Sequence, residues 1–245
     1  MPQTGVDRRE IARTAARVAA ALAVLYAVMV GLGLLLTKLL EGTWPVTAEG
    51  EGSRDLARER SGIMNDVTVV LGEMGNTITI VVLMVIVAVV LRLTLNRWRE
   101  SAFVVLAVSA QALVFMLTQL VLSRQRPGVP RLDPSPPTSS FPSGHTGAAI
   151  ALYGAVALVV LWHVRRPALR IALAALLILL PFLVAYARLY RGMHHPTDIV
   201  GSIVNAVACL WVSARNIMPG GRDSAAEDGK PPSGEPVTHQ KLAPT

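Results

Sequence analysis

Three short segments carry residues whose types and spacing could act together on a phosphate group. They are Arg126 with Pro127, the Pro-Ser-Gly-His segment 142–145, and the segment from Arg188 to Asp198, which contains His194. Arginine offers paired hydrogen bonds to phosphate oxygens, and histidine can serve as nucleophile, acid or base near neutral pH. Together these residue types favour phosphoryl chemistry.

The Pro-Ser-Gly-His segment precedes an apolar run, so it is expected to open a helix. A helix N-terminus presents unpaired backbone amides and the positive end of the helix dipole, which together bind phosphate well. Gly144 would allow close backbone approach, and Ser143 would add a hydroxyl. The alternative is that Ser143 is an ordinary helix cap and that His145 has no role.

His194 and Asp198 are spaced i, i+4 at the head of the last apolar segment, with Pro196 suited to a first helical turn. A carboxylate there could accept a hydrogen bond from one imidazole nitrogen, so that the other presents its lone pair. His194 would then be a nucleophile or base. The alternative is a capping role for Asp198, with interfacial histidines at 194 and 195.

Arg126 and Arg188 are the expected phosphate ligands, since each lies within one loop's reach of a histidine motif. The alternative for both is an anchor to lipid headgroups. That anchoring role is our main expectation for Arg124, Arg131 and Arg191. A zinc site is not expected, because the two histidines lack a clear third ligand.

The elements that position these residues are predicted to be membrane-spanning helices. Hydrophobic residues make up 52% of the 245-residue chain and charged residues 16%, whereas soluble domains carry about 25% charged residues. A bilayer core is crossed by about 20 apolar residues in a helix. Six segments meet or approach this length: 18–37, 74–91, 101–123, 146–164, 171–187 and 199–214.

We therefore predict an all-α fold, an integral-membrane bundle of six transmembrane helices. The second helix is expected to begin before residue 74, because residues 65–72 are also largely apolar, and the last two are expected to borrow flanking residues. The single cysteine, Cys209, lies in an apolar run and is expected to pack as a small hydrophobe. The net charge of +7 is spread between apolar runs, which argues against nucleic-acid binding.

The ordered motifs resemble the three-part signature of the type 2 phosphatidic acid phosphatase family, which comprises integral-membrane lipid phosphatases. The resemblance covers roughly residues 101–214 and rests on Arg126-Pro127, on the segment 142–145, and on Arg188, His194 and Asp198 with their spacing. Two positions depart from the pattern. Gln119 stands where the family has a lysine, and Ala187 stands where it has a serine.

The resemblance implies a catalytic mechanism. His194, oriented by Asp198, would attack phosphorus to form a phosphohistidine, and His145 would act as general acid and then as base. Phosphate binding would come from Arg126, Arg188, Ser143 and Gly144, with Gln119 in doubt as a weaker donor. No metal and no cofactor is implied.

The implied substrates are lipid phosphates or diphosphates, held among membrane lipids: polyprenyl diphosphate such as undecaprenyl diphosphate, phosphatidate or phosphatidylglycerophosphate. Polyprenyl diphosphate is slightly favoured by the side of the membrane on which the site is expected. Two other functions remain open, a lipid phosphotransferase and a non-catalytic binder or transporter of lipid phosphates. The oligomeric state is not predicted.

Loop charges predict the orientation of the helices. Eleven arginines, with few acids near them, lie before the first segment, in alternate loops and, as Arg215, directly after the sixth segment, against nine Lys and Arg residues in the other loops, where residues 41–63 are also acidic. The set of loops with more basic residues is expected to be cytoplasmic.

We thus predict a cytoplasmic N-terminus (1–17), a six-span phosphatase domain (18–215, with its motifs at 119–198) and a disordered cytoplasmic tail (216–245). The site would face the periplasm or exterior of a plasma membrane, and the excess of Arg over Lys hints at a bacterial genome.

Overall fold

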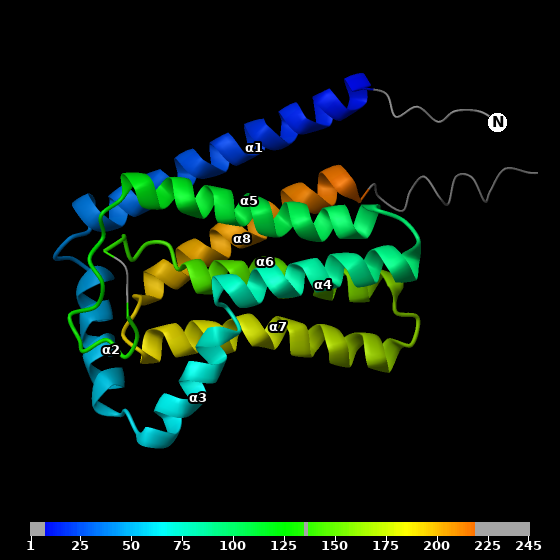
Figure 1. Ribbon diagram of the computed structural model, residues 1–245. Helices are drawn as coiled ribbons and strands as arrows, with labels where there is room; N and C mark the ends of the chain where they lie inside the picture. Colours follow the sequence, from blue (N-terminus) through cyan, green and yellow to red (C-terminus); the bar gives the residue numbers. More distant parts are fainter. Residues whose placement is uncertain (1–7, 135–136, 219–245) are drawn as a thin grey trace, which may run out of the picture.

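The computed structural model describes residues 8–134 and 137–218, and in these the chain forms eight helices (Figure 1). The expected tail lies mostly outside the described residues. The helices are α1 (Arg8–Leu34), α2 (Val46–Arg58), α3 (Gly62–Glu73), α4 (Thr77–Leu95), α5 (Arg99–Val121), α6 (Gly144–His163), α7 (Pro167–Tyr190) and α8 (Pro196–Ile217). A single π-helical turn, Leu35–Leu39, extends α1.

Six of these helices are long and apolar enough to cross a membrane: α1 with its π-turn, and α4 to α8. The predicted all-α fold with six spans is therefore confirmed. The first span begins at Arg8, ten residues earlier than expected, and the last two do borrow flanking residues, reaching 24 and 22 residues.

The expectation for the second span was wrong. Residues 65–72 belong to a separate helix, α3, and do not extend α4. A turn at Gly75 ends α3, and the Asn76 side chain then accepts a hydrogen bond from the backbone N–H of Ile78 and so starts α4 at Thr77. Apolar composition alone could not reveal this break, because α3 and α4 are both rich in aliphatic residues.

The bundle is built around α6, which packs against α4, α5, α7 and α8. Helix α1 lies against α5 and α8 at one side and diverges from them toward its N-terminal end (Figure 1). Because the number of spans is even, the start of α1 and the end of α8 lie at the same end of the bundle (Figure 1).

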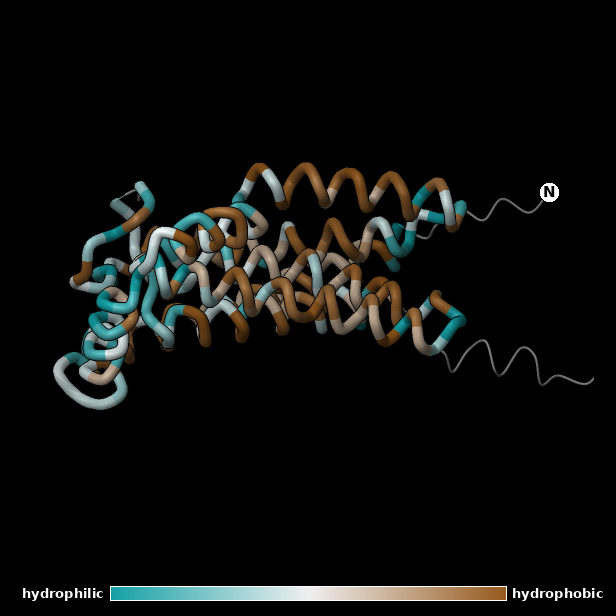
Figure 2. Tube along the Cα trace, turned by 90° about the horizontal axis from the view of Figure 1, so that it is seen from below, coloured by the Kyte–Doolittle hydropathy of each residue, from teal (hydrophilic) through white to brown (hydrophobic). Residues whose placement is uncertain are grey.

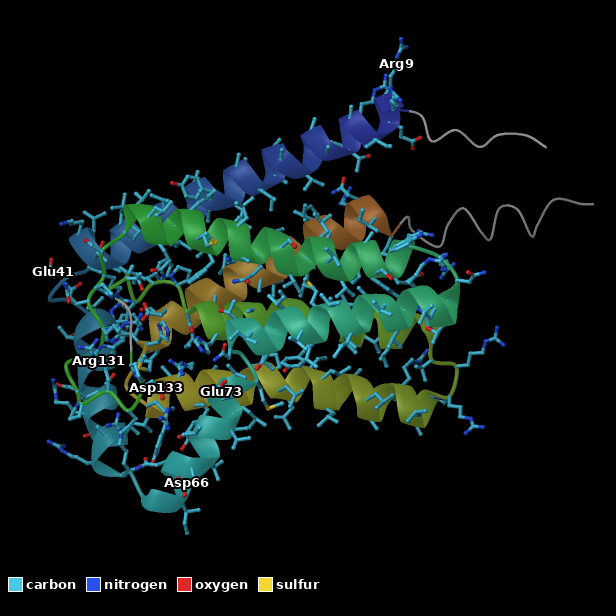
Figure 3. The ribbon with its side chains drawn as sticks, viewed as in Figure 1. Arg9, Glu41, Asp66, Glu73, Arg131 and Asp133 are labelled. Atoms are coloured by element: carbon cyan, nitrogen blue, oxygen red, sulfur yellow. The ribbon has the colours of Figure 1, made fainter. Side chains whose placement is uncertain are left out.

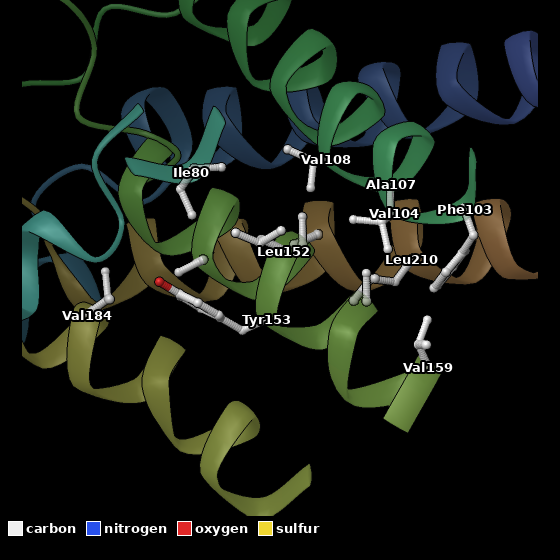
Figure 4. Close-up of a cluster of buried hydrophobic side chains, with 14 residues drawn as sticks. Ile80, Phe103, Val104, Ala107, Val108, Leu152, Tyr153, Val159, Val184 and Leu210 are labelled. Carbon is white, nitrogen blue, oxygen red and sulfur yellow. The ribbon is translucent and has the colours of Figure 1, made fainter. Parts of the chain in front are cut away.

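The buried core runs through the middle of the five packed spans (Figure 4). Small residues of α6, Ala149, Ala151 and Ala155, are fully buried and let the neighbouring helices approach closely. The hydroxyl of Tyr153 donates a hydrogen bond to the Met74 carbonyl oxygen at 2.9 Å, which attaches the α3–α4 turn to α6. Cys209 is buried and unpaired in the core, as expected.

The outer surfaces of the spans are apolar, whereas polar residues gather at the two ends of the bundle and along α2 (Figure 2). The two short helices α2 and α3 pack against α7 at one end. Arg60, between them, donates hydrogen bonds to the carbonyl oxygens of Tyr190 and Pro130 at 3.0 and 2.7 Å. The segment 41–63 is thereby joined to the loops that follow α5 and α7.

Candidate active site

The three motif segments meet at the end of the bundle that α2 and α3 cover, where α6 and α8 begin and α7 ends (Figure 1). A cavity of about 370 Å³ lies there. Six of the predicted site residues line it: Gln119, Arg126, Gly144, His145, Arg188 and His194. The other two, Ser143 and Asp198, are fully buried behind its wall.

A larger space, of about 920 Å³, lies between α1 and α5. Its lining is almost entirely aliphatic and contains no histidine or arginine. The smaller cavity is therefore the candidate active site, because it holds the residues that could react, whereas the larger space does not.

The turn after α7 presents His194 to the cavity. Arg191 ends the helix, Gly192 adopts a left-handed conformation with φ of 71°, and the N–H of Met193 returns to the Arg188 carbonyl oxygen at 3.0 Å. This is the Schellman arrangement, in which glycine tolerates the positive φ that other residues resist. The turn places Arg188 and His194 at the same cavity although five residues separate them.

The tautomer of His194 is fixed by a backbone carbonyl. Nδ1 of His194 lies 2.8 Å from the carbonyl oxygen of Ser140. A carbonyl can only accept, so Nδ1 carries the proton and Nε2 keeps a lone pair in the neutral ring. Burial lowers the pKa of His194 below its usual value, although the nearby Asp198 carboxylate raises it in part. The imidazole is therefore neutral at neutral pH, as a nucleophile requires.

Asp198 differs in detail from the sequence-based expectation. Helix α8 begins at Pro196, so His194 precedes the helix and does not share a face with Asp198. The expected hydrogen bond between them is replaced by the bond to Ser140, and Oδ2 of Asp198 lies 3.7 Å from Nδ1. Asp198 instead completes a capping box, accepting from the N–H of His195 at 2.7 Å. Its charge still faces the Nδ1 side of the ring.

The start of α6 places His145 and Gly144 on the cavity wall. The hydroxyl of Ser143 caps this helix through the N–H of Thr146 and bonds the Thr146 hydroxyl at 3.1 Å, which is the alternative role considered above. A Cβ at Gly144 would lie 2.8 Å from the ring of Phe115 on α5. Glycine is thus needed at 144 to pack the start of α6 against α5.

Arg126 and Arg188 bring two guanidinium groups to the cavity. Nη1 of Arg126 donates to the Met193 carbonyl oxygen at 2.7 Å, and Nη1 of Arg188 donates to Asp133 at 2.8 Å. The Nε atoms of both arginines are buried without a hydrogen-bond partner among the described residues. A phosphate oxygen would be a suitable acceptor for these groups.

Asp133 lies in the loop between α5 and α6, near the end of α7, and was not among the residues predicted from the sequence (Figure 3). Its carboxylate forms ion pairs with Arg188 and Arg191. Burial would raise the pKa of its carboxyl, but hydrogen bonds and charges from Arg191 and Arg188 outweigh this and hold the pKa below its usual value. Arg191 is buried in this cluster and also bonds the Asn65 carbonyl oxygen. The expectation that Arg191 anchors headgroups was therefore wrong.

The same expectation was wrong for Arg124. Its side chain is buried and ion-paired with Asp198 and with Glu49 of α2. Glu49 and Asp133 could not be recognised from sequence, since each is one acid among several charged residues. The only available signal was an isolated acid in a basic loop for Asp133, and the amphipathic pattern of α2 for Glu49.

Gln119 lies in the last turn of α5 and reaches the Pro-Ser-Gly-His segment. Its Nε2 donates to the carbonyl oxygens of Phe141 and Pro142 at 3.2 and 3.3 Å. Its Oε1 is buried without a partner among the described residues. The amide thus supports the loop with its N–H groups and presents no positive charge to the cavity.

We expect Gln119→Lys to raise turnover about fivefold. A charged donor strengthens a hydrogen bond to phosphate by about 1 kcal/mol, which corresponds to that factor in rate. The initial rate of phosphate release from a lipid phosphate measures this change. The control is Gln125→Lys, which changes an exposed residue of the loop after α5, outside the cavity lining. A clear loss of rate in Gln119→Lys would show instead that the cavity is shaped around the neutral amide.

Among the described residues, no group of three or more His, Cys, Asp and Glu side chains is arranged to hold a metal ion. The groups that converge are two imidazoles, two guanidinium groups and a helix N-terminus. Fold and site thus define a class of protein: a six-span membrane protein with histidines and arginines gathered at one end of its helical bundle.

Comparison with known proteins identifies the family within this class. The family model of the PAP2 superfamily matches residues 76–219, more than half of the chain, and the protein belongs to that superfamily. This confirms the resemblance inferred from the motifs. No curated protein sequence matches the chain significantly.

Two solved structures share the fold. The transmembrane PAP2-type phosphatidylglycerolphosphate phosphatase of Bacillus subtilis superposes with a TM-score of 0.67 at 18% identity, covering 86% of this chain and 96% of its own. LpxE of Aquifex aeolicus superposes with a TM-score of 0.54 at 22% identity, covering 67% of this chain and 93% of its own. At these identities the likeness establishes the fold alone.

Proposed function

We propose that this protein is a membrane lipid phosphatase that hydrolyses a phosphomonoester or diphosphate on a lipid. The observation that carries the proposal is the cavity itself, which holds His145 and His194 with two arginines. From these residues its lining continues along the apolar spans α4 and α5, past Ile80, Val81 and others. A phosphate could thus reach the histidines while its lipid chain stays among apolar side chains.

In the first proposed step, Nε2 of His194 attacks phosphorus, an N–P bond forms, and the bond to the leaving oxygen breaks. His145, whose protonated form is favoured by the negative charge of the bound phosphate, gives its proton to that oxygen. Arg126 and Arg188 bind the non-bridging oxygens and stabilise the charge that develops on them. Gly144 lies at the helix N-terminus beside them and would add its backbone N–H.

In the second proposed step, His145 accepts a proton from water, whose oxygen attacks phosphorus as the N–P bond breaks. Phosphate leaves, His194 is neutral again, and His145 is protonated again. Every group used is a side chain or backbone amide of this chain. The reaction should therefore proceed in EDTA.

The proposed orientation places both termini in the cytoplasm and the cavity at the outer face of the plasma membrane. It is supported by the basic residues at the far end of the bundle, which include Arg97, Arg99 and Arg165. A site on that face favours polyprenyl diphosphate as substrate, with phosphatidate and phosphatidylglycerophosphate as the alternatives. The domain proposal changes at both boundaries, because α1 already begins at Arg8 and α8 continues to Ile217.

The proposal is tested by phosphate release from purified protein in detergent with EDTA. Polyprenyl diphosphate, phosphatidate and a soluble aryl phosphate are compared, with His194→Gln measured beside the wild type. We expect release from at least one lipid, faster than from the aryl phosphate, and none in the variant.

Each other outcome has a definite meaning. Transfer of the phosphoryl group to an added alcohol or lipid, in place of release, would establish a phosphotransferase. Binding of a lipid phosphate without release or transfer would establish a non-catalytic binder. Equal release from wild type and His194→Gln would contradict the proposed mechanism.

A further inference from the structure

A buried arginine outside the three motifs contacts the carboxylate behind His194. Arg124 lies in the loop after α5, and only 7% of it is exposed. It is absent from the lining of the cavity that holds His194. Its charge therefore serves a purpose other than direct contact with a substrate in that cavity.

The side chain and the backbone of Arg124 hold the two groups that face Nδ1 of His194. Nη1 donates to Oδ1 of Asp198 and, at 2.7 Å, to the hydroxyl of Thr197. The Arg124 carbonyl oxygen accepts the N–H of Ser140 at 2.9 Å. The Arg124 side chain thus fixes the carboxylate of Asp198, and its backbone carbonyl holds Ser140, the residue whose own carbonyl oxygen bonds His194.

Glu49 of α2 completes the arrangement. Nη2 of Arg124 donates to its Oε2 at 2.9 Å, and the Glu49 side chain is 4% exposed. A carboxylate on a helix outside the membrane spans is buried at such a position only with a partner, because desolvation of an unpaired charge is costly. The ion pair therefore attaches α2 to the loop that supports His194.

We propose that Arg124, held in place by Glu49, is a positioning residue for His194. This proposal rests on the proposed function, since it concerns how the nucleophile of that reaction is oriented. Arg124 keeps the Ser140 carbonyl oxygen and Asp198 on the Nδ1 side of the ring, so that Nε2 faces the cavity as the unprotonated nitrogen. Loss of the correct histidine tautomer in serine proteases costs about 10⁴-fold in rate.

The test compares kcat, KM and the pH profile of Arg124→Gln, Arg124→Lys and Glu49→Gln. Arg124→Gln should lower kcat about 10- to 100-fold, the size of loss seen when a partner that orients a metal-bound histidine is removed. Its KM should change less than about threefold, because Arg126 and Arg188 still bind the phosphate. Arg124→Lys should restore part of the loss, since an ammonium can pair with one carboxylate.

The pH profile separates a charge effect from damage to the fold. The charged and titratable groups that face His194 are Asp198, Arg126, Arg188 and His145. Removal of the Arg124 cation leaves Asp198 free to stabilise the protonated ring, so the acid limb should move to higher pH. Glu49→Gln removes an anion, so its acid limb should move in the opposite direction, with a smaller loss of kcat.

Matched controls come from α2. Glu51→Gln changes an exposed acid two residues from Glu49, and Arg58→Gln removes an exposed arginine from a surface ion pair. Both should leave kcat and the pH profile unchanged. The inhibition constant of inorganic phosphate and the thermal unfolding midpoint show that each variant is folded with its cavity intact.

The proposal is overturned if folded Arg124→Gln and Arg124→Lys keep the wild-type kcat and pH profile. It is also overturned if KM and the phosphate inhibition constant rise while kcat is unchanged, because Arg124 would then bind substrate. If Arg124→Gln does not fold, Arg124→Lys and Glu49→Gln decide by the same criteria.

A measurement that does not depend on turnover distinguishes the proposed function from the positioning role of Arg124. The ¹⁵N chemical shifts of labelled histidine report the tautomer and titration of His194. We expect an Nδ1–H tautomer in the wild type and a higher titration midpoint in Arg124→Gln. If the wild type releases no phosphate, yet it has the Nδ1–H tautomer and Arg124→Gln has the higher midpoint, the proposed function fails and the positioning role stands. An unshifted midpoint overturns the positioning role whatever the activity.

Discussion

His194→Gln is expected to lower the rate of phosphate release by about 10⁴-fold or more, the size of loss seen when a covalent nucleophile is removed. Glutamine can still donate to the Ser140 carbonyl oxygen, which His194 does at 2.8 Å, but it has no nitrogen lone pair for phosphorus. Arg126 and Arg188 remain, so phosphate should still bind. The rate at saturating lipid phosphate is the measurement.

The matched control for this variant is His163→Gln. His163 lies at the other end of α6 and contacts Arg97 and Glu100, far from the cavity. Its substitution should leave the release rate within about twofold of the wild type, as expected for a site away from the chemistry. A folded His194→Gln protein that binds inorganic phosphate and retains more than a tenth of the rate would refute the nucleophile assignment.

His145→Gln is expected to slow turnover about 10²- to 10⁴-fold, the range for removal of a general acid and base. With a lipid substrate the first step is slowed, because the leaving oxygen is not protonated. With an aryl phosphate the leaving group needs no proton, so only the second step depends on His145. Phosphoryl-enzyme should therefore accumulate with the aryl substrate.

The intermediate is detected by intact mass after quenching in base, in which an N–P bond survives. The expected result is a stoichiometric phosphoryl adduct in His145→Gln and none in the double variant His145→Gln/His194→Gln. Accumulation on a residue other than His194 would change the nucleophile assignment. Wild-type rates with both substrates would remove His145 from the mechanism.

Much of the fold was predictable because a bilayer imposes a simple rule on sequence. A helix that crosses about 30 Å of hydrocarbon needs about 20 apolar residues, which composition alone reveals. The rule failed between α3 and α4, where the break at Gly75 and Asn76 is set by a turn and a cap, not by polarity. Both helices are apolar, so a count of apolar residues merges them.

The chemistry-bearing residues were also predictable, because the three motifs bring rare residue types together at fixed spacing. His145, His194, Arg126 and Arg188 do line one cavity. The sequence could not show whether the polar residues beside them, Ser143 and Gln119, bind phosphate or support the backbone. The Ser143 hydroxyl caps α6, and Gln119 bonds two backbone carbonyl oxygens, because these are the partners their positions bring within reach.

The sequence by itself thus determined six membrane helices, the family, and the residues gathered at one end of the bundle, since hydropathy and motif spacing are local properties of the chain. Only the tertiary structure decided the tautomer of His194 and the burial of Arg124 with Glu49. Those contacts join residues 54 and 75 positions apart in the chain. Residues so far apart in the chain come into contact only when the helices pack, and a local sequence pattern does not predict such contacts.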